Sequence, residues 1–279
     1  MEKESAVLCA DHISKWYDGR CILKDVSLHL ETGELVCLLG VSGAGKTTLF
    51  HTLSGLETPE EGELVSLLGV SGSGKTTLFN VLSGIIPPDE GKVYLKDQDV
   101  TSTPGSISYM LQKDLLLPHK KMLDNVALPL VLRGESKQAA REKAQPYFAQ
   151  FGLEGTEAQY PAQLSGGMRQ RAALLRTFLG SRGVVLLDEP FSALDALTKR
   201  EIHRWYMGMM DSLRLTTLFI THDIDEAILL SDRIYILSGR PGAITAELTI
   251  SPSRPRSLDF GLSAEFLAYK KQILALLNQ

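Results

Sequence analysis

The chain repeats one 29-residue unit back to back, at 33–61 and 62–90, and each copy carries a glycine-rich loop after an apolar run. The loops read GVSGAGKTT at 40–48 and GVSGSGKTT at 69–77. Both match G-x-x-x-x-G-K-[ST], in which glycines turn backbone N–H groups toward a phosphate. The apolar runs ELVCLLG and ELVSLLG fit buried parallel strands. We therefore predict a nucleotide-phosphate site on an α/β fold, with two candidate loops for it.

The loop residues expected at the phosphates are glycines, hydroxyl residues and one lysine in each copy. They are Gly40, Ser42, Gly43, Gly45, Lys46, Thr47 and Thr48, or in the second copy Gly69, Ser71, Gly72, Gly74, Lys75, Thr76 and Thr77. The lysine would reach the β- and γ-phosphates, and the hydroxyl of Thr47 or Thr76 would face Mg²⁺. The alternative is two glycine-rich turns on core strands. Chance produces one such match in about one chain of this length in a hundred.

Composition narrows the class of protein. The chain has 279 residues, 44% of them hydrophobic, which is enough for one large α/β domain with a small extension. The net charge is −4, and the Lys and Arg residues are dispersed rather than gathered in a block, so nucleic acid is not expected as a partner. Three cysteines, Cys9, Cys21 and Cys37, lack zinc-ligand spacing, which favours reduced thiols in the cytoplasm. There is no apolar leader and no stretch near the ~18 apolar residues of a membrane span, so a protein soluble by itself is expected.

Periodicity outlines the remaining elements. Residues 6–31 alternate apolar and polar positions around a turn at Asp18-Gly19, which predicts an antiparallel strand pair. Further strands are predicted at 92–100, 106–111, 183–190 and 216–223, and helices over 120–180 and 196–213, with breaks at Pro129 and Pro146. The tail 263–277 predicts an amphipathic helix that packs on the domain through one face, formed by Phe266, Ile273, Leu274 and Leu277.

Two more motifs lie downstream of the loops. They are LSGGMRQR at 164–171 and VVLLDEPFSALDAL at 184–197, and His222 ends the next predicted strand. With the phosphate loop, these motifs resemble the ATP-binding subunit of an ABC transporter over residues 6 to about 250. The resemblance implies an α/β P-loop NTPase (RecA-like) core with an antiparallel β edge and a helical subdomain at about 113–180. It divides the chain into an ABC ATPase domain at 1–250 and a C-terminal extension at 251–279.

The resemblance also implies the roles of single residues. Asp188 would hold the Mg²⁺ shell, Glu189 would polarise the attacking water, and His222 would sense the γ-phosphate. Gln112 would be the Q-loop glutamine that reports on metal and nucleotide, Asp195 the acidic D-loop residue, and Tyr17 the aromatic that stacks on adenine, with Trp16 as the alternative. Taken singly, the two acids could instead cap a helix, the histidine could be structural, and either aromatic could belong to the core.

Ser165, Gly166 and Gly167 immediately precede a helical run, where a hydroxyl and backbone N–H groups can meet an anion. In the family that anion is the γ-phosphate held by the other subunit. The resemblance therefore implies a head-to-tail pair of chains with two ATP molecules between them. Without the other motifs, a plain loop-to-helix turn would be the preferred interpretation.

The segments at 221–244 and 188–200 are similar to one branch of the family, the importers of nitrate, sulfonates, taurine and related solutes such as pyrimidine precursors. This resemblance implies membrane permease partners, an indirect periplasmic or lipoprotein solute-binding partner, and a place on the cytoplasmic face of a bacterial membrane. Two alternatives stay open: an ABC-type ATPase without a permease, in DNA repair or translation, and a non-hydrolysing interaction subunit. The compact helical insert, without heptads or zinc-ligand cysteines, disfavours the former.

The family needs one phosphate loop, and here 21 of the 29 paired positions are identical, with every phosphate-contacting residue type preserved in both. The spacing from Tyr17 to Lys46 is 29 residues and from Lys75 to Gln112 is 37, so removing either copy leaves spacings like those of the family. We predict the first copy as the working site, because it completes the N-terminal sheet before the second is synthesised. The second would then bulge outward, add to a sheet edge, or take the place of the family's next strand.

Overall fold

The computed structural model describes residues 7–17, 19–32, 34–40, 64–68, 86–95, 98–181, 183–191, 199, 203, 205–209, 216–238, 241, 243–254 and 256–277. Apart from Gly40, both phosphate loops lie outside these ranges. The strands are β1 (Leu8–Tyr17), β2 (Arg20–Leu30), β3 (Leu35–Gly40), β4 (Leu64–Leu68), β5 (Glu90–Leu95), β6 (Gln98–Asp99), β7 (Ser108–Met110), β8 (Val184–Asp188), β9 (Thr216–Thr221), β10 (Arg233–Ser238) and β11 (Ala243–Thr249).

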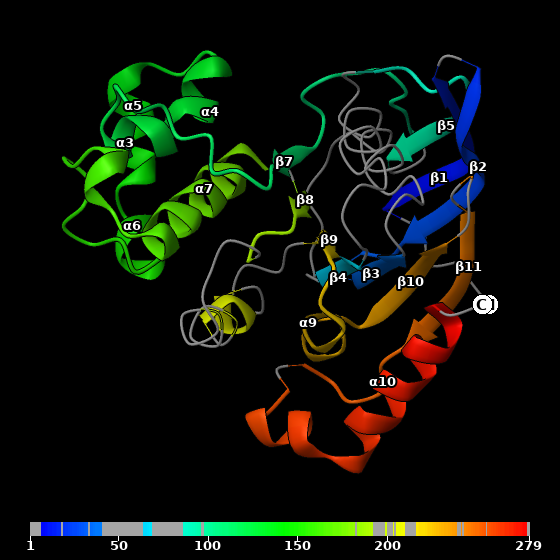
Figure 1. Cartoon of the computed structure of the whole chain (residues 1–279). Helices are drawn as coiled ribbons and strands as arrows, with labels where there is room; N and C mark the ends of the chain where they lie inside the picture. Colours follow the sequence, from blue (N-terminus) through cyan, green and yellow to red (C-terminus); the bar gives the residue numbers. More distant parts are fainter. Residues whose placement is uncertain are drawn as a thin grey trace.

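The α-helices are α3 (Met122–Val126), α4 (Leu128–Leu132), α5 (Lys137–Ala144), α6 (Tyr147–Gln150), α7 (Gly166–Gly180), α9 (Ile224–Leu230) and α10 (Ala264–Leu277), with 3₁₀ turns η1 (Pro161–Gln163) and η2 (Leu258–Leu262). The helices α3 to α7 form a lobe beside the sheets, and α9 and α10 lie at the opposite side of the molecule (Figure 1). In the described part of the chain, no helix is long and apolar enough to cross a membrane.

Two sheets make up the β structure. The first has the order β2-β1-β5-β6, and the second has the order β11-β10-β3-β9-β8-β7, with β4 also paired to β9. The predicted turn after Tyr17 joins β1 to β2, which are antiparallel with Tyr17 opposite Arg20. The second sheet is parallel from β10 to β7 and gains its antiparallel edge at β11. The predicted α/β core is therefore confirmed, and the antiparallel strand pair predicted at 6–31 is present as β1 and β2, in a separate sheet with β5 and β6.

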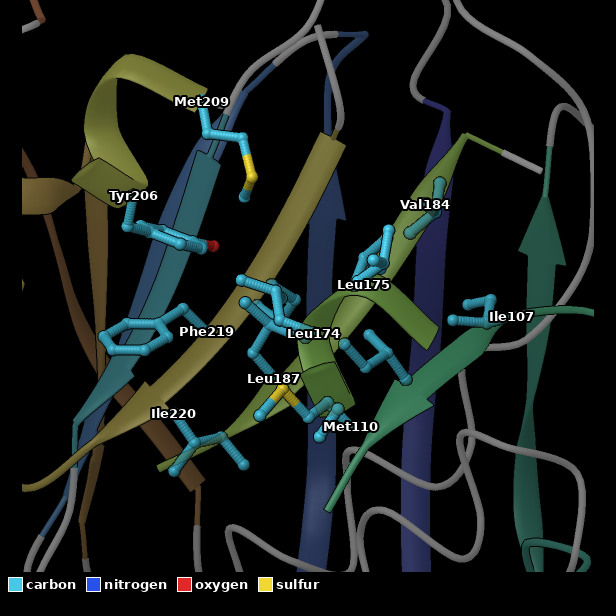
Figure 2. Packing of buried hydrophobic residues seen from close by; sticks show 14 of the residues in the cluster. Ile107, Met110, Leu174, Leu175, Val184, Leu187, Tyr206, Met209, Phe219 and Ile220 are labelled. Carbon is cyan, nitrogen blue, oxygen red and sulfur yellow. The ribbon is translucent and has the colours of Figure 1, made fainter. Parts of the chain in front are cut away.

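The central strands β8 and β9 are buried along their whole lengths. Their sequences VVLLD and TTLFIT are continuous apolar or β-branched runs, as expected for parallel strands covered on both faces. Figure 2 shows Leu174 and Leu175 of α7 close to Leu187 of β8, within the main hydrophobic core. This packing joins the helical lobe to the sheet that carries the candidate site.

The prolines break the helical lobe where the sequence predicts. Pro129 lies in the first turn of α4, and Pro146 precedes α6 as its N-cap. A proline is tolerated there because the first N–H groups of a helix have no intrahelical partner. The buried Asn125 amide accepts from the Leu117 N–H at 2.6 Å and donates to the Leu117 carbonyl at 3.1 Å, which fixes the segment that enters the lobe.

The two repeated units meet β9 in the same way. Leu35 of β3 and Leu64 of β4 both lie opposite Thr217, and the parallel register then continues identically through Ile220. The other edge of β9 is taken by β8. Because one strand edge forms a ladder with one neighbour at a time, β3 and β4 are alternatives for a single place in the sheet.

This arrangement corrects two expectations about the second copy. The strand β4 takes neither a sheet edge nor the place of the family's next strand, which is filled by β5 paired antiparallel to β1. The argument from the order of synthesis also fails, because β3 belongs to the second sheet. Its neighbours β9 and β10 are made after both units, so neither copy reaches the place first.

The β3 strand has contacts on both sides, which favours the first copy on different grounds. It pairs with β9 at one edge and with β10 at the other, where Val36 lies opposite Arg233. Just before β3, the buried Glu34 carboxylate forms an ion pair with the Arg233 side chain of β10 and accepts from the Glu31 N–H at 3.0 Å. Burial raises the pKa of Glu34 to about 7, although the Glu31 amide and Arg233 oppose the shift.

Stability should therefore depend on pH through Glu34. An unfolded glutamate loses its proton near pH 4.5, whereas Glu34 in the folded chain keeps it to about pH 7. The folded state binds more protons between these values, so the free energy of unfolding contributed by Glu34 falls as the pH rises. Glu34→Gln should lose less stability than wild type between about pH 5 and about pH 8 in urea unfolding. Parallel curves for the two proteins would contradict the prediction.

The predicted C-terminal helix is present as α10, but its buried face differs by one residue. Phe266 and Ile273 are buried and Leu277 packs beside them, whereas Leu274 is 43% exposed. Tyr269 and Leu276 complete the face instead, because steps of three and four residues from Phe266 follow the 3.6-residue period. The prediction for Leu274 was wrong.

Candidate active site

The candidate site lies where β8 and β9 end. Asp188 is the last residue of β8 and lies opposite Ile220 of β9, and the next residue, Glu189, donates its backbone N–H to the Ile220 carbonyl at 2.8 Å. His222 follows the end of β9 by one residue. Both acidic residues are almost fully buried, at 7% and 5% exposure. The parallel register therefore brings together three residues that the sequence predicts for one site.

The Glu189 carboxylate is the centre of this group. Its Oε2 atom accepts a hydrogen bond from Gln112 Nε2 at 3.1 Å and lies 3.2 Å from His222 Nδ1. Gln112 comes from the segment after β7, 77 residues away in the sequence. Two polar groups on one oxygen orient the carboxylate. The structure thus brings Gln112, Glu189 and His222 together as predicted.

The backbone of Glu189 has a φ of 45°, in the left-handed region. A residue with a long side chain adopts this conformation at a cost on the order of 1–3 kcal/mol, and such residues concentrate at functional sites. Sequence reasoning could not find this feature, because Pro190 after it does not dictate the conformation.

Tyr109 of β7 is a neighbour that the sequence analysis missed. Burial, followed by the negative charge of Asp188, raises the pKa of its phenol above the ordinary range. The hydroxyl therefore stays protonated and neutral beside the Asp188 carboxylate. The only sequence signal was its place in a predicted strand next to Gln112.

The LSGGMRQR segment at 164–171 contains the first residues of α7. Ser165 is the N-cap, and its side-chain oxygen accepts from the Met168 N–H at 3.3 Å. Ser165 and Gly166 are exposed, while Gly167 is buried. An exposed helix N-terminus can approach an anion held by another chain.

Polar side chains of α7 contact the segments that follow Gln112 and Glu189. Gln170 Nε2 donates to the Pro190 carbonyl at 2.5 Å, directly after Glu189. Arg176 donates to the carbonyls of Asp114 and Leu115 at 2.6 and 2.8 Å, and Arg169 donates to the Asp114 carboxylate at 3.1 Å. The helix that begins at Ser165 therefore holds both the segment after Gln112 and the segment after Glu189.

Several predicted residues lie outside the described part of the chain. These are Ser42, Gly43, Gly45, Lys46, Thr47 and Thr48, their second-copy counterparts Gly69, Ser71, Gly72, Gly74, Lys75, Thr76 and Thr77, and Asp195. Gly40 ends β3, and Tyr17 ends β1 without a described side chain. The Trp16 N–H donates to Asp89 at 2.9 Å. The roles of all these residues stay predictions.

A parallel sheet with adjacent acidic residues at the end of one strand, a histidine at the end of the next and a glycine-rich loop after a third defines an α/β nucleotide hydrolase of the P-loop class. The ABC transporter family model matches residues 23–66 and 60–192, and the chain belongs to this family. The two matched stretches meet where the two repeated units join.

Curated relatives cover most of the chain. The formylaminopyrimidine import ATP-binding protein ThiZ of Halalkalibacterium halodurans is 44% identical over 258 residues, which are 92% of this chain and 90% of the relative. The nitrate import ATP-binding protein NrtD of Synechocystis is 35% identical over 262 residues, covering 92% and 88%. Both are importer subunits, which is consistent with the predicted branch.

Solved structures agree with the fold. The dimeric bacterial ABC transporter cassette MJ0796 has a TM-score of 0.67 and 25% identity, covering 88% of this chain and all of that one. A post-hydrolysis dimer of the same cassette, bound to ADP and Pi, has a TM-score of 0.66. The ABC ATPase fold predicted from the sequence is confirmed.

Proposed function

We propose that this chain hydrolyses ATP to drive the import of a small solute across a membrane. The observation that carries the proposal is the contact of Glu189 with both Gln112 and His222 at the ends of adjacent strands. Importer subunits for formylaminopyrimidine, nitrate and sulfate among the relatives support the direction of transport. A small anionic or pyrimidine-like solute is the corresponding cargo class.

In the proposed reaction, water attacks the γ-phosphate of ATP and yields ADP and inorganic phosphate. Glu189 accepts the proton of the attacking water, because its carboxylate is buried and already oriented by Gln112 and His222. His222, 48% exposed in its side chain, can turn its other ring nitrogen toward the phosphate. The loop lysine, Lys46 or Lys75, would hold the β- and γ-phosphates.

Mg²⁺ is the metal that this family implies. The donor types fit it, since the Asp188 carboxylate and the Gln112 amide would offer hard oxygen ligands, and Thr47 or Thr76 would add a hydroxyl. Within the described residues no cluster of three or more His, Cys, Asp or Glu side chains is arranged as a metal site. When bound, Mg²⁺ neutralises charge on the phosphate oxygens.

A second copy of the chain is the proposed partner at the exposed end of α7. Ser165 and Gly166 would meet the γ-phosphate of the partner's ATP, giving two composite sites in a head-to-tail dimer. The dimeric state of the MJ0796 cassette supports this arrangement. The proposed location is the cytoplasmic face of a bacterial membrane, against permease subunits, with a solute-binding protein acting on the far side.

The permease would dock beside the Q-loop, on the apolar residues between Gln112 and α3. Leu116 and Leu117 lie in this segment, but Leu116 is buried at 7% exposure and Leu117 is half-buried, whereas Leu115 is 51% exposed. The backbone of Leu115 lies in the left-handed region, with a φ of 41°. Arg176 of α7 donates a hydrogen bond to the Leu115 carbonyl, so the proposed docking residue is connected to the helix that begins after Ser165.

Cysteine crosslinking tests the proposed docking in membranes that contain the cognate permease. In a chain with Cys9, Cys21 and Cys37 replaced by serine, Leu115→Cys is expected to crosslink to the cytoplasmic loops of the permease. The matched control is Leu262→Cys. Leu262 is 89% exposed and ends η2, just before α10 and away from the helical lobe, so its cysteine variant should give no such product. Crosslinks from Leu262→Cys alone would overturn the docking assignment, and failure to co-purify with any membrane protein would favour an ATPase without a permease.

A further inference from the structure

A buried ionic cluster lies directly behind His222. The two residues beside the histidine both belong to it: the Thr221 hydroxyl donates to the Glu226 carboxylate, and Asp223 is the N-cap of α9. The Asp223 side chain accepts from the backbone N–H groups of Asp225 and Glu226 at 2.9 and 3.2 Å. The backbone that carries His222 is therefore held on both sides by polar contacts with the first turn of α9.

Lys199 and His203 complete the cluster from another part of the chain. The Lys199 ammonium lies 2.9 Å from Asp223 and also forms an ion pair with Glu226. His203 Nε2 lies 3.2 Å from the same Glu226 carboxylate. Lys199 and His203 are four positions apart and both are helical, so the helical period places both on one face.

The cluster is buried rather than exposed on the surface. Glu226 is 4% exposed and His203 9%, and a buried carboxylate is stable only with partners that compensate for its lost hydration. Burial lowers the pKa of Lys199, but Glu226 and Asp223 outweigh it and raise that pKa overall. Burial likewise raises the pKa of Asp223, but Lys199 and the α9 amides outweigh it and hold that pKa below its usual value. Both charges are therefore kept at neutral pH.

The same cluster also contacts the segment that follows Glu189. The His203 ring packs edge-on against Phe191, with 4.7 Å between ring centroids, and Phe191 follows Glu189 by two residues. Phe191 in turn packs on Phe219 of β9. His203 thus contacts the segment after Glu189 through its ring and the segment after His222 through Glu226.

We propose that Lys199 and His203 are positioning residues that act through Glu226 to fix His222 at the Glu189 carboxylate. The proposal rests on the proposed function and adds two residues to the three that meet at the Glu189 carboxylate. The His222 side chain is 48% exposed, and the constraint on its ring therefore includes the position of its backbone. The first turn of α9 supplies that constraint, and Lys199 and His203 hold the turn.

The kinetic experiment uses Glu226→Gln and Lys199→Met, with Asp225→Asn as the matched control. Asp225 lies in the same turn of α9, but its carboxylate faces outward to Lys270 at 2.6 Å. Glu226→Gln and Lys199→Met should lower kcat on the order of tenfold to a hundredfold, with the KM for ATP nearly unchanged. Asp225→Asn should keep wild-type kcat, and the conservative Lys199→Arg should recover most of the activity lost in Lys199→Met. Equal losses in all four variants, or none in Glu226→Gln, would overturn the proposal.

A second measurement does not depend on hydrolysis. In protein labelled with ¹⁵N-histidine, the imidazole signals of His222 are assigned by their loss in His222→Ala. They should shift in Lys199→Met and stay in place in Asp225→Asn, while circular dichroism shows that each variant is folded. Unmoved His222 signals in Lys199→Met refute the positioning role. An inactive wild-type protein whose His222 signals still respond to Lys199→Met would refute the proposed function alone.

Discussion

Glu189→Gln is expected to abolish nearly all ATP hydrolysis and to leave ATP binding intact. The amide keeps the shape of the side chain and can still contact Gln112 and His222, but it cannot accept a proton from water. Loss of such a group costs on the order of 10² to 10⁴ in rate. Because ATP then stays bound, an ATP-dependent dimer should accumulate. Phosphate release and size-exclusion chromatography with Mg-ATP measure the two effects.

Glu135→Gln is a suitable control for Glu189→Gln. Glu135 forms a surface ion pair with Lys143 at 2.8 Å, in the helical lobe and away from β8 and β9, so its loss should leave turnover unchanged. Wild-type turnover in Glu189→Gln would remove this carboxylate from the mechanism.

Lys46→Ala is expected to eliminate ATPase activity, whereas Lys75→Ala should leave most of it. One pair of catalytic acids serves one phosphate loop at a time, and the lysine in that loop makes charge-assisted contacts that alanine cannot replace. The first copy is favoured because β3 pairs with both β9 and β10 and is preceded by the Glu34–Arg233 ion pair. Nucleotide binding and phosphate release, measured on both variants, check the assignment.

The remaining outcomes of this pair of variants are also informative. If Lys75→Ala alone is inactive, the second copy fills the place beside β9. If each variant keeps half or more of the activity, the copies exchange. Deletion of 62–90 should give an active and more stable protein, since it removes an apolar strand that has no separate place in the sheet.

Local patterns were sufficient for much of the fold. The antiparallel pair around Gly19, the buried strands β8 and β9 and the breaks at Pro129 and Pro146 all follow from periodicity and backbone chemistry within a few residues. Gln112, Glu189 and His222 come together because each follows a strand of one sheet, and motif spacing already indicated those strands.

Non-local packing decided what the sequence could not reveal. The contact of His203 with both Phe191 and Glu226 depends on how three separate segments cross, and no short pattern encodes that crossing. The register of β4 could not be foreseen either, since it is determined by β9 more than a hundred residues later. Leu274 was assigned to the wrong face of α10 because several leucines near the C-terminus fit a helical stripe equally well.

The identical register of β3 and β4 reverses the usual ranking of harmful substitutions. Ordinarily a proline in a central strand is worse than the loss of one lysine, because it removes a ladder hydrogen bond and breaks the sheet. Here Lys46→Ala leaves β3 beside β9 with an inactive first loop. The intact second loop then stays away from Asp188 and Glu189. Leu38→Pro would expel β3 from β9, and β4, preceded by Glu63 as β3 is by Glu34, has a matching set of partners in β9. In a genetic screen, Lys46→Ala would therefore abolish function. Leu38→Pro would retain it, because the second copy would take the place of the first beside β9.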